Sequence, residues 1–572
     1  MSSEIEEDDD TSGWKTLDDK PTPDGSDYVY EAFERVSEIG KGDRWYDLPY
    51  RVLSWLLFAW PRQILPQRAR EILNSGRIFL TPFNTHDRHK VWSLDDRSRN
   101  VFVPEEEHVT VPGLWVVELF PPSEFASLEA SIEANSWDSK RSYPQDLAGN
   151  QEMLARSRAG AGWNWWRLAE IYAPTTKQLS VYGVREKLPA EFTAVELRAV
   201  QIGTGLTAVV ARFDLTKDAA KSIDTVWHTR HEPQLVYDEG RLRAEDRKWA
   251  TFRVTQEARE SLHNAARKWI ADRCPGFFVS NDEPQLLMDM LLFDKHDPIP
   301  GERTDREFSD ALRALGLTGH EAVHRTSPDI PQLLLSPVEG LLSPALDRKR
   351  TWALWGNLGI VASSINHLGM RNSASDRAVA HAVDDRMRNF LVALAVSDFL
   401  TLMEAKYAEL RDSAHTRHGT FKAKGLKRLR ASFLTLSLDL TSVARDVDSF
   451  WSREWRYAGE ARFTRDYAPW IVARDENSGS KRFPPIDMND EMRKTQRQQL
   501  KHLIGLDRDY RDILATVASL GASVDAFKIG RVALWIAFAS MATALVTLLI
   551  TQPGNHTTLG NLLSWIRGLF PS

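Results

Sequence analysis

Residues 319–324 read GHEAVH, the pattern in this sequence whose residue types and spacing come closest to a known catalytic centre. In zinc hydrolases, two histidines one helical turn apart bind the metal, and the glutamate between them acts as general base. His320 and His324 have that spacing, and Glu339 is the best candidate for a third ligand. The sequence thus contains a candidate metal site, provided that these residues form a helix.

The surroundings of this pattern leave three interpretations open. Glycines precede it, and Ser327-Pro328 would end the helix directly after it, which is unusual for a zinc-binding helix. A second group, His228, His231 and Glu232, would join the site only if folding brings it close. The alternatives are a catalytic zinc ion, a structural or regulatory metal ion, and surface histidines without a metal, and the sequence favours the last.

Other catalytic patterns are missing from the sequence. Gly203-Thr204-Gly205 lacks the later glycine or the Gly-Lys pair of a phosphate loop, and no kinase, Walker or nucleophile-elbow pattern occurs. Cys274 is the only cysteine, which fits a reducing compartment and a structural role. No cofactor is predicted beyond a candidate divalent metal ion, and a non-enzymatic role is favoured. The net charge of -6 does not suggest a nucleic-acid partner.

The elements before residue 331 predict an α+β fold. Residues 1–27 form an acidic tail without a core-forming pattern, and residues 28–330 form one or two cytoplasmic α+β domains. Two β-rich runs flank Gly203-Thr204-Gly205 and predict a hairpin. The expected strands cover 109–120, 194–202, 206–213 and 249–254, and the expected helices cover 123–135 and 257–273, with one starting near 216.

Residues 331–530 predict a bundle or stalk of long helices. Apolar residues recur at spacings of three and four over 426–450 and again from Leu503 into the membrane segment, and a third helix, over 376–411, is apolar over a wider arc. Three such helices form an antiparallel bundle, in which the first and third run in the same direction. The alternatives for this seam are packing within the chain, packing between subunits, or both. Because one register spans stalk and membrane segment, we expect both, and therefore a homo-oligomer with coiled-coil packing.

The segment from Val532 to Thr551 predicts a transmembrane helix. No ionisable side chain occurs between Arg531 and His556, and 20 residues span ~30 Å as a helix. The alternative is a buried helix of a water-soluble protein. Lys528 and Arg531 precede the segment, so the positive-inside rule predicts a single-pass protein of the cell (inner) membrane with its N-terminal bulk in the cytoplasm. Residues 531–551 are the helix, and 552–572 are a short extracytoplasmic amphipathic tail.

Small and hydroxyl-bearing residues line one face of this helix. Such a stripe lets helices approach closely or lines a narrow polar path, although a helix rich in alanine and threonine also produces one by chance. The candidate packing or pore residues are Ala533, Ala537, Ser540, Ala544, Thr547 and Thr551.

A basic turn joins the first two long helices. If the third helix runs toward the membrane, the turn at 412–425 lies near the inner leaflet, where cations attract anionic lipid. The alternative is an ordinary solvated turn. The candidate lipid-binding residues are Arg417, Lys422, Lys424, Lys427, Arg428 and Arg430.

Together, the cytoplasmic α/β region, the stalk helices and the membrane helix resemble the CorA family of divalent-cation transporters over Asp376 to Phe570. The resemblance implies a pentamer whose first membrane helix lines the pore. The family's Gly-Met-Asn signature is absent, and the turn reads Gln552-Pro553-Gly554-Asn555.

Three functions are compatible with these features. The first is a membrane-tethered cytoplasmic sensor or effector that oligomerises through its stalk and membrane helix. The second is a CorA-like oligomeric channel or transporter, and the third is a membrane-tethered zinc hydrolase. The first is preferred, because it needs neither a solvent-lined stripe nor a histidine-bound metal.

Overall fold

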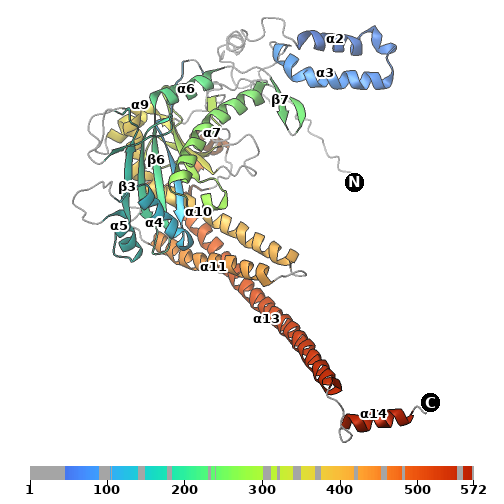
Figure 1. Ribbon diagram of the computed structural model, residues 1–572. Helices are drawn as coiled ribbons and strands as arrows, with labels where there is room; N and C mark the ends of the chain where they lie inside the picture. The colour runs from blue at the N-terminus through green and yellow to red at the C-terminus, as the bar shows by residue number, and fades with distance from the viewer. Residues whose placement is uncertain are drawn as a thin grey trace, which may run out of the picture. The chain divides into compact units, whose positions relative to one another are not determined.

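The computed structural model describes residues 46–88, 103–104, 106–138, 149–176, 183–229, 234–238, 240–245, 247–299, 311–312, 314–317, 323–338, 350–366, 375–417, 423–452, 460–478, 484–550 and 558–569. The chain divides into two compact units (Figure 1). The α+β unit comprises residues 1–399 and 445–495, and the helical unit comprises residues 400–444 and 496–572.

A mixed sheet of twelve strands organises the α+β unit. The strand order is β14-β13-β10-β11-β12-β9-β2-β6-β5-β3-β4, and β1 pairs with β9. Neighbours are antiparallel except β9–β12 and β3–β4, which are parallel. The bounds are β1 Val109–Thr110, β2 Gly113–Phe120, β3 Trp165–Tyr172, β4 Val184–Arg185, β5 Phe192–Gln201, β6 Thr207–Leu215, β9 Leu286–Phe293, β10 Val323–Thr326, β11 Leu334–Pro337, β12 Thr351–Asn357, β13 Thr464–Tyr467 and β14 Ile486–Asp487; β7 Gln234–Asp238 and β8 Arg241–Glu245 form a separate ribbon.

The helices of the described residues range from short 3-10 turns to α13, which has 63 residues. Their bounds are α2 Asp47–Phe58, α3 Gln67–Arg88, α4 Phe125–Ala134, α5 Asn150–Arg158, α6 Lys217–His228, α7 Arg247–Arg273, α9 Leu358–Asn366, α10 Asp376–Arg417, α11 Ala423–Ser452, α12 Pro469–Ser478, α13 Met488–Ile550 and α14 Thr558–Leu569; the short 3-10 helices are η1 Trp60–Gln63, η4 Pro122–Glu124 and η5 Val279–Asn281.

The predicted hairpin around Gly203 is confirmed. β5 and β6 are antiparallel neighbours, and Thr216 begins α6 as its N-cap, with its Oγ1 accepting a hydrogen bond from the Ala219 amide at 3.1 Å. Alternation along β5 sends Val195 and Leu197 to the main apolar core. Glu196 and Arg198, which alternate with them, point to the opposite face of the sheet, because successive strand residues alternate.

Both faces of the sheet are covered by helices. On one face, Arg259 of α7 pairs with Asp289 of β9. On the other, the Trp115 indole N–H of β2 donates to Asp384 of α10 at 2.8 Å. Trp115 lies opposite Arg212 in the β2–β6 register, so Arg212 faces α10 as well. The α10 face therefore buries charged side chains that a one-sided sheet would leave in water.

In the helical unit, α10, α11 and α13 pack around aromatic side chains. Tyr407 stacks on Tyr510 with ring centroids 6.0 Å apart, and Phe433 lies edge-on to both rings. The side chain of Thr401 bonds that of Gln499, and Tyr407 bonds Asp507, so the contacts advance together along α10 and α13. The first and third long helices thus run in the same direction, as predicted.

Two predictions about elements need correction. Residues 249–254 are the start of α7 and not a strand; Ala250 is buried, and the helical spacing of buried residues continues from it to Arg259 and His263. Residue 330 does not end the strand-containing region, because β11 to β14 lie beyond it and join the sheet. Long-range pairing incorporates these short strands, and local periodicity carries no signal for it.

Candidate functional site

The segment Ile529–Thr547 of α13 is the one helix among the described residues that is long and apolar enough to cross a membrane. Its 19 residues correspond to ~28 Å, close to the hydrocarbon thickness of a bilayer. None of the segment is buried within the chain. Leu534, Trp535 and Ile536 point in different directions around the helix, and all are more than half exposed.

The stripe of small residues lies on this exposed segment. Ala533, Ala537, Ser540, Ala544 and Thr547 are exposed, and Thr551 lies outside the described residues. The Thr547 hydroxyl donates to the Thr543 carbonyl at 2.7 Å. The hydrogen of this hydroxyl is therefore bonded within its own helix, and the oxygen keeps its capacity to accept.

The basic turn is described only at its edges. Arg428 and Arg430 are exposed on α11. Lys422 lies outside the described residues, as do the side chains of Arg417, Lys424 and Lys427, so the predicted lipid contact stays a prediction.

The candidate zinc motif does not have the helix that it requires at its second histidine. His324 lies in β10 and is opposite Asp466 of β13 in the register, because pairing with this distant strand replaces the local helical preference. Burial lowers the pKa of His324 more than Asp466 raises it. His320 and Glu339 lie outside the described residues, as do His231 and Glu232 of the second group.

The structure brings His228 of that second group to residues that the sequence did not single out. The Asp224 carboxylate lies 2.8 Å from Nδ1 of His108, and the His108 and His228 rings are 5.4 Å apart between centroids. Asp224 and His228 are one turn apart on α6, a spacing visible in the sequence, but His108 joins them only through the fold.

This cluster has the residue types of a metal site, but both ring nitrogens of His228 already lie against backbone carbonyl oxygens. One ring nitrogen of His228 lies 2.6 Å from the Asp224 carbonyl oxygen, and the other lies 2.7 Å from that of Glu107. Asp224 also accepts the Val109 amide at 3.0 Å. A metal ion would have to displace one of these carbonyl contacts of His228, so the arrangement fits a clamp between α6 and the segment before β1.

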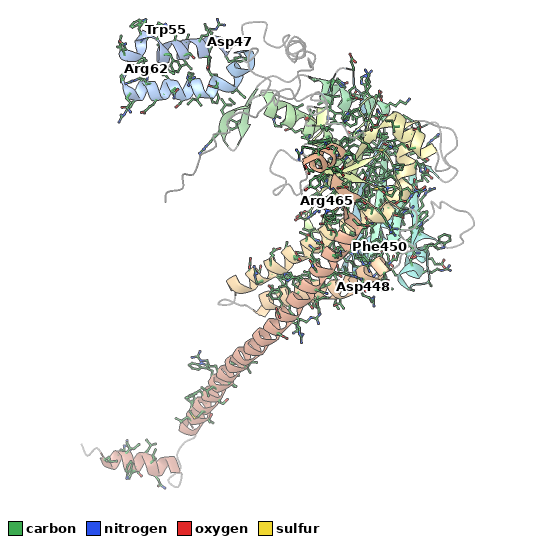
Figure 2. All side chains as sticks on the ribbon, turned by 180° about the vertical axis from the view of Figure 1, so that it is seen from behind. Asp47, Trp55, Arg62, Asp448, Phe450 and Arg465 are labelled. Atoms are coloured by element: carbon green, nitrogen blue, oxygen red, sulfur yellow. The ribbon has the colours of Figure 1, made fainter. Side chains whose placement is uncertain are left out.

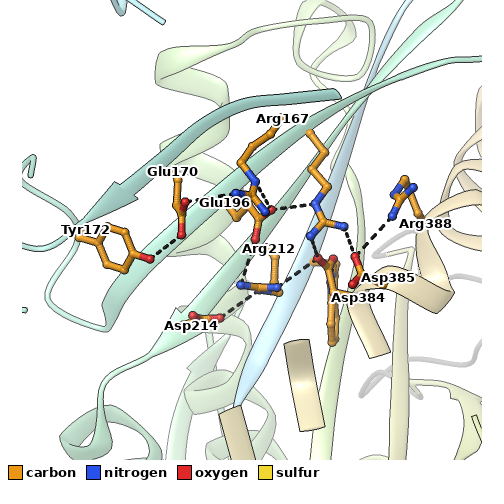
Figure 3. Close-up of polar contacts among 11 residues, drawn as sticks. Arg167, Glu170, Tyr172, Glu196, Arg212, Asp214, Asp384, Asp385 and Arg388 are labelled. Atoms are coloured by element: carbon orange, nitrogen blue, oxygen red, sulfur yellow. Dashed lines mark hydrogen bonds and ion pairs between the residues drawn. The ribbon is translucent and has the colours of Figure 1, made fainter. Parts of the chain in front are cut away.

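A buried ionic network links the sheet to α10 (Figure 3). Arg198 of β5 contacts Glu196 at 2.8 Å, Asp384 at 2.8 Å and Asp385 at 2.7 Å. Arg212 of β6 contacts Glu196, Asp384 and Asp214 at 3.1–3.2 Å. Glu196, Arg198, Arg212 and Asp384 are almost fully buried, whereas the side chains of Asp214 and Asp385 are 20% and 51% exposed.

The charges in this network hold one another ionised. Burial raises the pKa of Glu196, but the positive charges of Arg198 and Arg212 lower it by more than burial raises it, so the net pKa is about 2. Burial likewise lowers the pKa of both arginines, and the surrounding carboxylates raise it more. Removing one member would leave a buried charge without compensation, which costs far more than an exposed pair contributes.

The outer edge of the network carries an aromatic contact. The Arg388 guanidinium lies 3.8 Å from the centroid of the Trp165 ring, which is 41% exposed. Glu460 accepts the Asn389 amide at 2.7 Å, and burial raises the pKa of Glu460 to about 7, more than this bond and Arg388 lower it. The contacts of Arg198 and Arg212 with Asp384 and Asp385 make this network a docking device for α10 on the sheet.

The turn of the β5–β6 hairpin binds a carboxylate of the chain itself. The amides of Thr204, Gly205 and Leu206 donate to Asp446 of α11, at 3.1, 2.5 and 2.8 Å. A side-chain Cβ at Gly203 would lie 2.2 Å from Asp446 Cγ, so the turn needs glycine there. The sequence gave no sign that this turn binds a carboxylate of the chain.

Comparison with protein-family models finds no matching family, and comparison with curated proteins finds no similar sequence.

Proposed function

We propose that this chain is a membrane-tethered cytoplasmic sensor or effector, in which the α+β unit receives a signal and the long helices connect it to the bilayer. The observation that carries the proposal is the exposed apolar surface around Ile529–Thr547. A helix that is apolar on all sides is stable inside a core or inside a bilayer, and this one has no core around it.

The charges beside the segment support a cytoplasmic location for the N-terminal bulk. Lys528 precedes it and Arg531 lies in its first turn, whereas Arg567 is the single lysine or arginine after it. Short flanking segments rich in lysine and arginine remain on the cytoplasmic side. The amphipathic α14 exposes Leu562, Trp565 and Ile566, which suits the far membrane surface.

The long helices provide covalent routes between the units. α10, α11 and α13 each continue from the α+β unit into the helical unit, and α13 is unbroken to Ile550. The ionic network fixes α10 to the sheet and the Gly203–Leu206 turn fixes α11. A ligand or partner that disturbs either contact would therefore act directly on a helix that leads out of the unit.

Membrane integration is the first test. We expect the wild-type protein to stay with membranes washed in alkaline carbonate. Leu534→Arg combined with Phe538→Arg should release it, since one arginine near the helix centre costs about 3 kcal/mol. Leu438→Arg is the matched control, because Leu438 is 59% exposed outside the segment. Carbonate extraction of the wild type would overturn the proposal.

An oligomeric CorA-like channel is a second candidate, favoured by the unbroken passage of α13 into the candidate span. Its discriminating measurement is the mass of the particle in mild detergent. A ring of several subunits that conducts divalent cations in vesicles would support the channel, whereas a non-conducting oligomer would favour the tethered sensor or effector. A monomer would contradict the channel and the predicted self-association of the stalk.

A further inference from the structure

The N-terminal helical hairpin, α2–η1–α3, has an apolar surface that nothing in the described chain covers. One face of α2 packs against α3: Leu57 is buried, and a Cβ at Gly76 would lie 3.5 Å from Leu53. The opposite face is apolar too. Leu48 and Val52 lie one turn apart on it and are 68% and 47% exposed.

The apolar surface continues around the connection between the helices. Trp55 and Trp60 are 50% and 65% exposed and meet edge to face, with ring centroids 6.2 Å apart. Phe58 and Ile64 are also more than 60% exposed. This set of six residues, Leu48, Val52, Trp55, Phe58, Trp60 and Ile64, is called the apolar tip below. Trp55 is labelled in Figure 2.

Arginines accompany the tip. Residues 46–81 contain five arginines and two acidic residues, Asp47 and Glu71, which gives a net charge of +3. Arg51 and Arg62 are exposed, and Arg77 lies 5.1 Å from the centroid of the Phe58 ring. Tryptophan and phenylalanine with arginine around them form the combination that settles at the boundary between acyl chains and anionic headgroups.

We propose that the apolar tip of α2–η1–α3 inserts into the interface of an anionic bilayer and forms a second membrane contact, separate from Ile529–Thr547. It rests on the proposed function only in requiring a bilayer next to the chain. The net positive charge selects anionic headgroups, and the aromatic and aliphatic side chains supply the buried apolar area. The length of α2, 12 residues, is too short for a span, so the contact lies in the plane of the interface.

The test measures how deeply single spin-labelled residues of the full chain lie in the bilayer. Cys274 is fully buried, so a spin label can be attached at an added cysteine. Three variants serve: Val52→Cys in the tip, Asn74→Cys on the exposed polar side of α3, and Ala537→Cys in the candidate span. Each is placed in nanodiscs of phosphatidylcholine with or without phosphatidylglycerol, and collisions with oxygen and with a water-soluble nickel chelate are compared.

We expect the label at Val52 to be severalfold less accessible to the nickel chelate than the label at Asn74 in the anionic discs, and to lose this protection in the neutral discs. Protection in both lipids would overturn the selection for anionic headgroups. Equal accessibility at Val52 and Asn74 would overturn membrane contact, and protection of Val52 in detergent alone would mean that a protein surface covers the tip.

The label at Ala537 separates this proposal from the membrane anchor. A label deep in the bilayer at Ala537, together with an accessible label at Val52, would refute membrane contact by the apolar tip and support the membrane anchor. A protected label at Val52, together with an accessible label at Ala537, would support the tip contact and refute the anchor. As a second measurement, Trp55→Glu should abolish the protection of Val52, while Trp55→Phe should retain it. Because Trp55 and Val52 are both exposed, these substitutions should leave the circular dichroism spectrum unchanged. Protection of the Val52 label that persists in Trp55→Glu would contradict the proposal.

Discussion

Arg198 of β5 and Asp384 of α10 are both buried and lie 2.8 Å apart, whereas the neighbouring Asp385 pairs with the same guanidinium from a half-exposed position. Asp384 also accepts the Trp115 indole N–H and contacts Arg212. Two adjacent carboxylates of one helix thus make similar ion pairs in different dielectric surroundings.

This difference predicts unequal effects of one substitution. Asp384→Asn should lower the free energy of unfolding by about 3–5 kcal/mol, because two buried arginines lose compensation. Asp385→Asn should cost less than about 1 kcal/mol, because water replaces an exposed partner. Urea unfolding of the solubilised protein, followed by tryptophan fluorescence, measures both. Equal losses would show that burial does not control the strength of this contact.

A second prediction concerns the hairpin turn. Asp446→Ala removes the acceptor of three backbone amides, at Thr204, Gly205 and Leu206. The donors at Gly205 and Leu206 are buried, and each buried donor left without a partner costs about 1–3 kcal/mol, so the loss should exceed about 2 kcal/mol. Hydrogen exchange of a peptide covering these amides should speed up. Asp448→Ala is the control on the same helix, since Asp448 is exposed, and similar exchange in both variants would argue against the carboxylate as the anchor.

A third prediction is a pH dependence that arises from Glu118 of β2. This carboxylate accepts the amides of Phe278 at 2.8 Å and Leu119 at 3.1 Å. Burial nevertheless raises its pKa from 4.5 to about 8, because it outweighs the lowering by these hydrogen bonds. The folded protein therefore retains a proton that the unfolded chain releases, and this contribution to stability is lost as pH rises through about 8.

Glu118→Gln should remove that contribution. Between pH 5 and pH 9 the melting temperature of the wild type should fall, and the fall should be smaller in Glu118→Gln. Glu133→Gln changes an exposed carboxyl and should follow the wild type. Parallel curves for all three proteins would mean that Glu118 is ionised in the folded state throughout this range.

Several features followed from the sequence because local forces determine them. The apolar residues at spacings of three and four predicted α11 correctly, and Phe433, Leu436, Leu440 and Val443 are buried as that register requires. The hairpin at Gly203 and the helix start at Thr216 followed from turn and capping chemistry. The candidate span was visible because 20 residues without a charge are uncommon outside a bilayer.

The tertiary structure determined whether the charged residues of β5 are buried and whether the short segment around His324 forms a strand. Glu196 and Arg198 alternate with apolar residues on β5, a pattern typical of a strand with one wet face, but α10 covers that face and turns their charges into a buried network. The zinc motif requires His324 to lie on a helix, but pairing with β13 places it in a strand. Both outcomes depend on partners that are distant along the chain. The free energies of strand pairing and of desolvation with these partners exceed the local conformational preference, and a short stretch of sequence does not reveal them.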